Sequence, residues 1–141
     1  MICLDANVFL AAVLTAEPHH TSSAALIARV REGREEACVP ALFVPECVGA
    51  YARRTRRPGA IAAFSRLVRT FPVRLGSVDA ALAWRAAEIA AACFIKGPDA
   101  IYVATAERAG ATFVTWDAEV AERAAGVVRV ETPAGWLASA A

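Results

Sequence analysis

The sequence predicts an α/β protein in which a central, mainly parallel five-stranded sheet carries helices on both faces. Apolar runs of three to five residues alternate with longer segments of helical periodicity. This alternation is typical of parallel strands that are joined by right-handed helical crossovers. The 141 residues contain no internal repeat and no linker rich in proline or serine, so residues 1–141 are expected to form one domain.

The first half of the chain is expected to supply two strands and four helices. The strands are 2–4 and 36–39, and the helices are 7–14, 18–33, 40–57 and 58–70. Gly33 closes the apolar stripe of the second helix. Pro40 is expected to start the third helix, and Pro45 within it predicts a kink or a late start, because a proline ring removes one backbone hydrogen bond.

The second half is expected to complete the sheet. The strands are 73–75, 112–115 and 127–130, and the helices are 77–95, 99–109, 118–124 and 133–140. Ser77 is interpreted as the cap of the long alanine-rich helix. Gly97 and Pro98 are expected to break the chain before the next helix, which Gly110 ends.

Net charge, cysteine spacing and the apolar stretches indicate which classes of protein the sequence does not fit. The formal net charge of +1 gives no global basic character, and the four cysteines show no CxxC spacing. They are interpreted as reduced thiols rather than as a disulfide framework or a zinc site. No secretory signal is visible, and the apolar stretch 6–16 is far shorter than the ~20 residues of a membrane span. We therefore expect a cytoplasmic protein that does not enter a membrane.

Four arginines crowd together before Pro58: Arg53, Arg54, Arg56 and Arg57. Cations suit the C-terminal end of a helix, so a solvated helix end is one interpretation. A patch that contacts the phosphates of a nucleic acid is the other. The pattern alone does not choose between them.

Three aspartates stand where a buried element begins or ends. Asp5 directly follows the strand 2–4, Asp117 follows the strand 112–115, and Asp99 opens a helix. Because ligands bind outside the carboxyl ends of parallel strands, these groups are expected at one edge of the sheet, with Glu46 projecting to it. Grouped carboxylates repel one another, and a divalent cation offsets that repulsion. Oxygen ligands favour Mg²⁺ or Mn²⁺.

Each of these acids also has a simpler interpretation. Asp99 and Asp117 are compatible with helix caps, and Glu46 alone with a solvent-facing helical acid. For Asp5 the simpler interpretation is weakest, because this residue interrupts an apolar N-terminus. Asp79 is interpreted as a charge that complements a helix dipole.

The aromatic and imidazole side chains give weaker signals. The adjacent His19 and His20 do not share a helix face, so we expect solvated or capping roles rather than metal ligation. Trp84, Trp116 and Trp136 are interpreted as core or interface residues. Trp116 is also compatible with stacking on a base.

Four motifs in order along the chain resemble the PIN domain, a family of metal-dependent ribonucleases. They are residues 2–10, 39–46, 98–106 and 114–117. The resemblance implies a three-layer α/β/α sandwich and one or two Mg²⁺ or Mn²⁺ ions, bound by Asp5, Glu46, Asp99 and Asp117. It also implies that Thr115 orients water or an acid near the metal, and it suggests Asn7 as a weaker supporting residue.

The compact size resembles VapC-type toxins of bacterial toxin–antitoxin pairs, and this resemblance implies the function. The expected reaction is hydrolysis of RNA phosphodiester bonds, on single-stranded RNA, to a 5′-phosphate and a 3′-hydroxyl. The expected partners are a cognate antitoxin and a second copy of the chain. Because the net charge is near neutral, Lys96, the arginines 53–57 or a second subunit must offset the acidic pocket for RNA to bind.

Two departures and two alternatives remain open. Relatives often carry Asn three residues after the helical Glu, where this chain has Gly49, and a further acid beyond the fourth-strand Asp, for which Glu119 is the candidate. One alternative is a magnesium-dependent phosphotransferase, weakened because Asn7 and not an acid follows Asp5. The other is a non-catalytic module that binds RNA or protein.

Overall fold

The computed structural model describes residues 1–140, in which five strands form a single parallel sheet. β1 (Ile2–Leu4) is central and pairs with β2 (Ala37–Pro40) on one side and β4 (Thr112–Val114) on the other. β3 (Arg74–Gly76) and β5 (Val130–Glu131) form the two edges, giving the order β3-β2-β1-β4-β5. The predicted five-stranded parallel sheet is confirmed.

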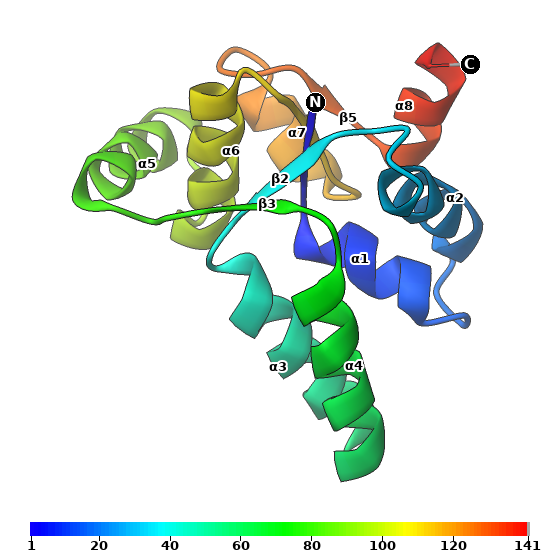
Figure 1. Ribbon diagram of the computed structural model, residues 1–141. Coiled ribbons are helices and arrows are strands. Elements are labelled where there is room, and N and C mark those ends of the chain that lie inside the picture. Colours follow the sequence, from blue (N-terminus) through cyan, green and yellow to red (C-terminus); the bar gives the residue numbers. More distant parts are fainter. Residues whose placement is uncertain (141) are drawn as a thin grey trace.

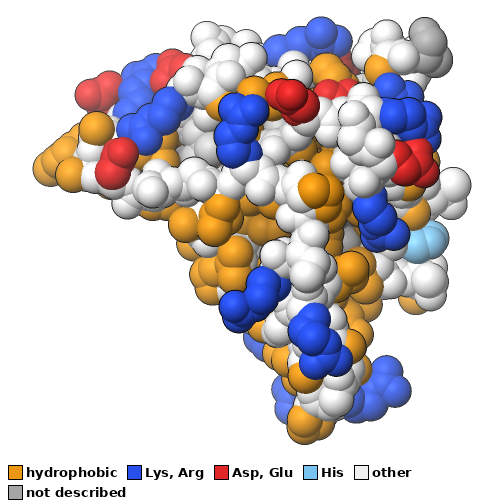
Figure 2. All heavy atoms as spheres, in the orientation of Figure 1, with side chains coloured by type: hydrophobic (Ala, Val, Ile, Leu, Met, Phe, Trp, Pro, Cys, Tyr) orange, Lys and Arg blue, Asp and Glu red, His pale blue; other side chains and the backbone are white. Residues whose placement is uncertain are grey.

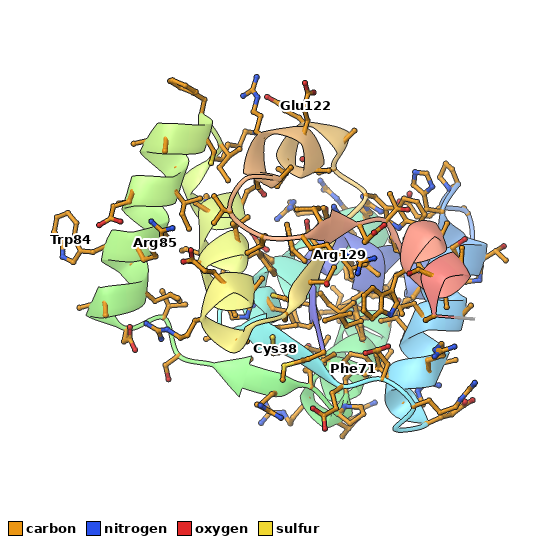
Figure 3. All side chains as sticks on the ribbon, turned by 90° about the horizontal axis from the view of Figure 1, so that it is seen from above. Cys38, Phe71, Trp84, Arg85, Glu122 and Arg129 are labelled. Carbon is orange, nitrogen blue, oxygen red and sulfur yellow. The ribbon has the colours of Figure 1, made fainter. Side chains whose placement is uncertain are left out.

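Helices cover both faces of this sheet, as the three-layer prediction requires (Figures 1 and 3). On one side α5 (Ala80–Cys93) packs against α6 (Gly97–Ala109) and α7 (Ala118–Ala124). α6 lies directly on β1, β2 and β4. Asp99, in the first turn of α6, lies close enough to Asp5 at the carboxyl end of β1 for its charge to act on it.

The other side is formed by the remaining helices. They are α1 (Ala6–Val13), α2 (His20–Arg31), α3 (Phe43–Thr55), α4 (Pro58–Thr70) and α8 (Pro133–Ser139). α1 packs on α2 and α3, and α2 packs on α8. α3 and α4 form a hairpin that extends beyond the sheet (Figure 1).

The hydrophobic core holds α1 and α3 against each other. β1 is fully buried and apolar, as expected for a central parallel strand with helices on both faces. Phe9 of α1 packs edge-on against Phe43 of α3, with ring centroids 5.6 Å apart, and also contacts Phe64 and Phe71. These aromatic contacts lock the two helices that carry Asn7 and Glu46.

Several element boundaries differ from the sequence predictions. Pro40 is the last residue of β2 and does not start a helix, so Pro45 lies in the first turn of α3. The late start predicted as one alternative is therefore found, because a first-turn proline has no backbone hydrogen bond to lose. Ser77 does not cap α5. Asp79 does, since its Oδ1 accepts a hydrogen bond from the Leu82 amide at 2.8 Å.

Smaller shifts affect other elements. Gly97 and Pro98 do not break the chain but form the first turn of α6, after Lys96 as its N-cap residue. The fifth strand lies at Val130–Glu131, later than residues 127–130, and α2 begins at His20 rather than at Pro18.

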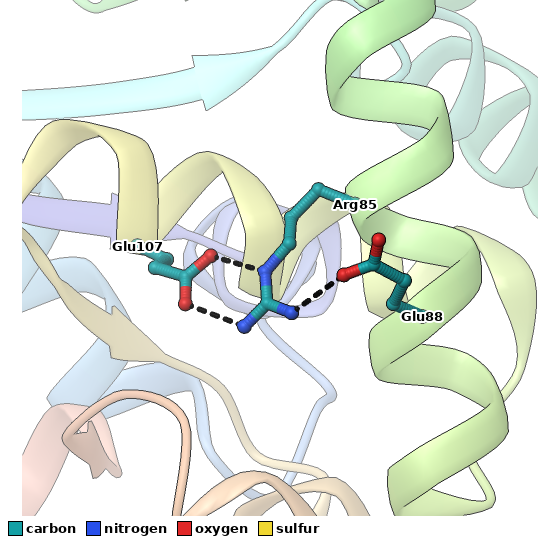
Figure 4. A network of polar contacts seen from close by, with 3 residues as sticks. All are labelled: Arg85, Glu88 and Glu107. Atoms are coloured by element: carbon teal, nitrogen blue, oxygen red, sulfur yellow. Dashed lines mark hydrogen bonds and ion pairs between the residues drawn. The ribbon is translucent and has the colours of Figure 1, made fainter.

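The outer surface of α5 and α6 is held by ion pairs. Arg85 of α5 donates two hydrogen bonds, each 2.7 Å long, to the Glu107 carboxylate of α6 (Figure 4). It also donates to Glu88 at 3.0 Å. Arg108 of α6 binds Asp79 in the same two-pronged way, at 3.0 Å for both contacts. Each acid of this surface thus has an arginine partner.

Two further sequence predictions concern the thiols and the membrane. Cys3, Cys38, Cys47 and Cys93 are all free thiols, as expected. Over residues 1–140 no single helix is long and apolar enough to span a membrane, and α5 with α6 reach that length and composition only as a pair bent by 114°.

Candidate active site at the carboxyl ends of β1 and β4

The candidate site lies where the order of the strands reverses. From β1 the chain adds β2 and β3 on one side, and then returns to the other side of β1 with β4 and β5. Such a switch point opens a crevice outside the carboxyl ends of the strands. Asp5 follows β1 here, and Thr115 and Asp117 follow β4.

Asp5 is the buried centre of the site. Only 8% of the residue is exposed, and its backbone amide continues the sheet by donating to the Val114 carbonyl at 3.0 Å. The side chain caps α1 by accepting from the Asn7 amide at 3.3 Å on Oδ1. Oδ2 accepts from the Asn7 side chain at 3.1 Å and from the Thr115 hydroxyl at 2.7 Å. Because a carboxylate offers about four lone-pair positions, Oδ1 keeps room for another partner.

Thr115 joins the ends of β1 and β4. It is 1% exposed, and its hydroxyl donates to Asp5 while accepting from the Asn7 side-chain amide at 3.1 Å and the Asp117 backbone amide at 3.0 Å. Asn7 Oδ1 in turn accepts from the Trp116 amide at 3.3 Å. Thr115 is thus placed to orient an acid rather than to touch a substrate, and Asn7 belongs to the same network.

Glu46 has a partner that the sequence analysis did not identify. The buried hydroxyl of Tyr102 donates to Glu46 Oε2 at 2.6 Å. Tyr102 stands one turn after Asp99 on α6, and that spacing was the only available signal. Burial raises the pKa of Tyr102 far above its ordinary value, and the contact with Glu46 adds to the rise. The hydroxyl therefore stays protonated and fixes one oxygen of Glu46.

The two helix-opening aspartates behave differently from each other. Asp117 Oδ1 caps α7 by accepting from the Glu119 amide at 3.0 Å and the Val120 amide at 3.1 Å, so its simpler interpretation as a cap holds. Asp99 makes no such capping bond, and within residues 1–140 its side chain has no hydrogen-bond partner. A small pocket of about 80 Å³ brings both aspartates together with Lys96 and Glu119.

The acids of the site lie close enough to act on one another's charge. Burial raises the pKa of Asp5 to about 6, although the hydrogen bonds from Thr115 and Asn7 lower it. The negative charges of Asp99 and Glu46 add to the rise. The site therefore holds more negative charge than its surroundings compensate.

Asp99 shows the same imbalance. Burial raises its pKa, and the charges of Asp117 and Glu46 raise it further. Lys96 lowers it and Glu119 raises it, with a net upward shift. Lys96 is thus close enough to the acids to act on them, but does not neutralise them.

The arginines 53–57 separate into different positions. Arg53 lines a pocket of about 430 Å³ together with Asn7 and Glu46. Arg54 is bound to Glu17. Arg56 ends α3 in a left-handed conformation with φ of 52°, Arg57 precedes α4, and both are exposed. Figure 2 shows Lys or Arg side chains on the surface of this hairpin. The structure brings one of the four to the acidic site.

The remaining sequence candidates lie beside the site or away from it. His19 stacks on Trp116 with ring centroids 3.8 Å apart, and the Trp116 indole donates to Ser23 at 2.8 Å. One face of Trp116 is therefore covered within the chain. Trp136 donates to Glu35 and is partly buried, whereas Trp84 is 75% exposed and is not a core residue.

The residues fit a hydrated Mg²⁺ or Mn²⁺ better than a closed metal cage. Within residues 1–140 no three His, Cys, Asp or Glu side chains are grouped tightly enough to enclose an ion. Mg²⁺ however keeps several waters and is bound through one or two carboxylates. The remaining lone pair of Asp5 Oδ1 and the carboxylate of Asp99, with the uncompensated charge around them, suit that mode.

Comparisons with known proteins point to one family. The PIN domain model matches residues 2–126 of this chain. Among solved structures, Mycobacterium tuberculosis VapC20, described as a sarcin–ricin loop cleaving toxin, has a TM-score of 0.73 at 22% identity, over 93% of this chain and 99% of that chain. FitAcB from Neisseria gonorrhoeae has a TM-score of 0.74 at 21% identity, over 94% and 98%. A toxin–antitoxin complex from Klebsiella pneumoniae has 0.68 at 16% identity, over 94% and 98%. Curated protein sequences give no match.

Proposed function

Because the chain belongs to the PIN domain family, we propose that it is a ribonuclease that needs Mg²⁺ or Mn²⁺ and hydrolyses phosphodiester bonds of single-stranded RNA. The observation that supports this most is Asp5. It is a buried carboxylate at the strand switch point, held by two side chains, and its burial raises its pKa to about 6, with the charges of Asp99 and Glu46 adding to the rise. A structural carboxylate in that position would be expected to have a cation beside it.

In this proposal some residues bind the metal and others orient the acids that bind it. Asp5 and Asp99 would bind the metal directly, and Glu46 and Asp117 would bind waters of its hydration shell. A bound metal supplies a water of lowered pKa and stabilises negative charge on a phosphoryl group. Thr115 and Asn7 fix the orientation of Asp5, and Tyr102 fixes that of Glu46. Lys96 lies beside Asp99 and Asp117, where it reduces the repulsion that an approaching RNA backbone meets.

We further propose that the nuclease is the cytoplasmic toxin of a toxin–antitoxin pair, acts as a homodimer and is silenced by a partner antitoxin. Support comes from the solved structures with the same fold, which include a toxin and a toxin–antitoxin complex. Arrest of growth when the chain is expressed alone, relieved by a small protein encoded beside it, is the expected outcome. Normal growth would leave a nuclease without a toxin role.

Cleavage of total RNA with Mn²⁺ tests the nuclease function. We expect Asp5→Asn and Asp99→Asn to reduce the rate by at least about 100-fold, since each removes a charge at the reacting centre. Asp79→Asn is the matched control, because Asp79 is also an aspartate at a helix start but is paired with Arg108 on the outer surface. It should keep near wild-type activity. Equal rates for all four proteins would overturn the site.

A second readout does not depend on turnover. Mn²⁺ should raise the unfolding temperature of the wild type and of Asp79→Asn, because a ligand that binds only the folded state stabilises it. The rise should be lost in the Asp5→Asn/Asp99→Asn double variant. The phosphotransferase alternative gains no support, because both oxygens of Asp5 accept hydrogen bonds, which does not favour a nucleophile for phosphotransfer.

A further inference from the structure

A pocket of about 430 Å³ lies beside Glu46, between α1 and α3. Its polar lining consists of Asn7, Glu46 and Arg53, and its walls are apolar, including Leu10 and Leu42. The pocket therefore adjoins the acidic centre through Asn7 and Glu46, and Arg53 is the cationic residue among those that line it. Its size suits one nucleotide of a longer chain.

The Arg53 side chain lies over a glycine of the same helix. Side chains on a helix lean toward its N-terminus, so Arg53, two turns after Glu46 on α3, leans back over Gly49. A Cβ atom at Gly49 would lie 3.5 Å from Arg53 Nη1. The guanidinium thus occupies the space that a larger side chain at position 49 would fill.

The Arg53 guanidinium has no partner of its own in the part of the chain that the structure describes. It forms neither a hydrogen bond nor an ion pair, even with Glu46 in the same pocket. The adjacent Arg54, by contrast, is bound to Glu17. An unpaired guanidinium beside an acidic site matches a phosphate, which it can bind through two parallel hydrogen bonds.

We propose that Arg53, whose guanidinium lies in the space that Gly49 leaves open, binds a phosphate of the RNA next to the bond that is cut. This inference rests on the proposed ribonuclease function. It replaces the predicted patch of four arginines with one residue that binds substrate at the site. Related sequences often carry Asn where this chain has Gly49. In this chain the Arg53 side chain supplies the polar group at that place instead.

Steady-state cleavage of total RNA with Mn²⁺ tests the role of Arg53. Arg53→Ala should raise KM by about 10-fold, since a hydrogen-bonded contact to a charged group is lost, and change kcat by less than about 2-fold. Arg53→Lys should fall in between, because an ammonium cannot bind a phosphate with two prongs. Arg57→Ala, the matched control at the hairpin tip, should change KM by less than about 2-fold. The slope of log KM against log salt should fall by about 0.7 for Arg53→Ala.

Substitutions at position 49 test whether the Arg53 guanidinium needs the space above Gly49. Gly49→Ala should leave KM unchanged, because its Cβ makes only an ordinary contact with Arg53. Gly49→Leu should displace the guanidinium and raise KM as Arg53→Ala does, with unfolding temperatures at or above that of the wild type. If Arg53→Ala and Arg57→Ala have the same KM, or Gly49→Leu behaves like Gly49→Ala, the inference is wrong. A wild type that cleaves no RNA would instead refute the proposed function.

Discussion

The acids of this protein fall into two regions that have the same residue types and opposite surroundings. On the outer surface of α5 and α6, Asp79 and Glu107 are each gripped by an arginine, and the pKa of each is lowered. At the ends of β1 and β4, Asp5 and Asp99 have no such partner, and the pKa of each is raised. The acids of the outer surface form ion pairs. The acids at the ends of β1 and β4 carry negative charge that no nearby cation neutralises.

The difference shows what marks a functional acid in this fold. All four groups stand at helix starts or on helix surfaces, so position alone does not separate them. Burial without a cation does, because such a group costs stability unless a ligand offsets it. The contrast can be tested by changing one member of each region.

The largest effect on stability is expected from pH. Because the folded pKa of Asp5, about 6, lies above its ordinary value of 3.8, the folded chain holds a proton that the unfolded chain has lost between these values. The free energy of unfolding should therefore fall as pH rises from about 4 to about 6, by about 3 kcal/mol, and level off above that.

Urea unfolding in EDTA at pH 4.5 and pH 7 measures this loss. The Asp5→Asn variant should lose less stability over the same interval, because its amide does not titrate. Asp79→Asn should follow the wild type, since the pKa of Asp79 is lowered and it stays ionised throughout. If the wild type and Asp5→Asn lose the same free energy of unfolding between pH 4.5 and pH 7, titration of Asp5 is not the cause of the loss.

A smaller effect is expected when Glu46 loses its donor. Tyr102→Phe should lower kcat by about 10-fold and the free energy of unfolding by about 1 kcal/mol, the usual worth of one hydrogen bond. Tyr51→Phe is the matched control: Tyr51 stacks on Phe64 and, within residues 1–140, its hydroxyl has no hydrogen-bond partner. If the two phenylalanine variants match in activity, Tyr102 does not position Glu46.

The smallest effect is expected on the outer surface. Glu107→Gln breaks the two-pronged contact with Arg85, but solvent-exposed ion pairs contribute little to stability. Thermal unfolding should shift by no more than about 2 °C, and RNA cleavage should not change. A loss of cleavage comparable to that of Asp5→Asn would show that the two regions are not independent.

The fold was predictable because each buried strand is a short apolar run between helical segments. Sequence reasoning also placed Asp5 correctly at the end of β1, since a lone acid directly after a buried apolar run costs stability unless it serves a site. Sequence reasoning could not tell which of Asp99 and Asp117 is a helix cap, because both look alike as acids at a helix start. Only the structure distinguishes the cap from the unpartnered carboxylate.

Other features depended on contacts between distant segments. Tyr102 meets Glu46 across 56 positions, and its spacing one turn after Asp99 does not indicate Glu46 as its partner. The cap of α5 was assigned to Ser77 instead of Asp79 because both residue types favour that position, and the choice depends on where the chain leaves β3. The separate roles of the four arginines likewise follow from the direction of α3.

The hydrogen bond between Thr115 and Asp5 also bears on how the protein is made, since it joins groups 110 positions apart. During translation β1 leaves the ribosome long before β4, and contacts this distant form late because a long loop must first close. A nascent or prematurely terminated chain therefore carries Asp5 without Thr115, and a central strand with one side unpaired. An incomplete copy has no finished site, so the proposed nuclease activity would begin only once synthesis is nearly complete.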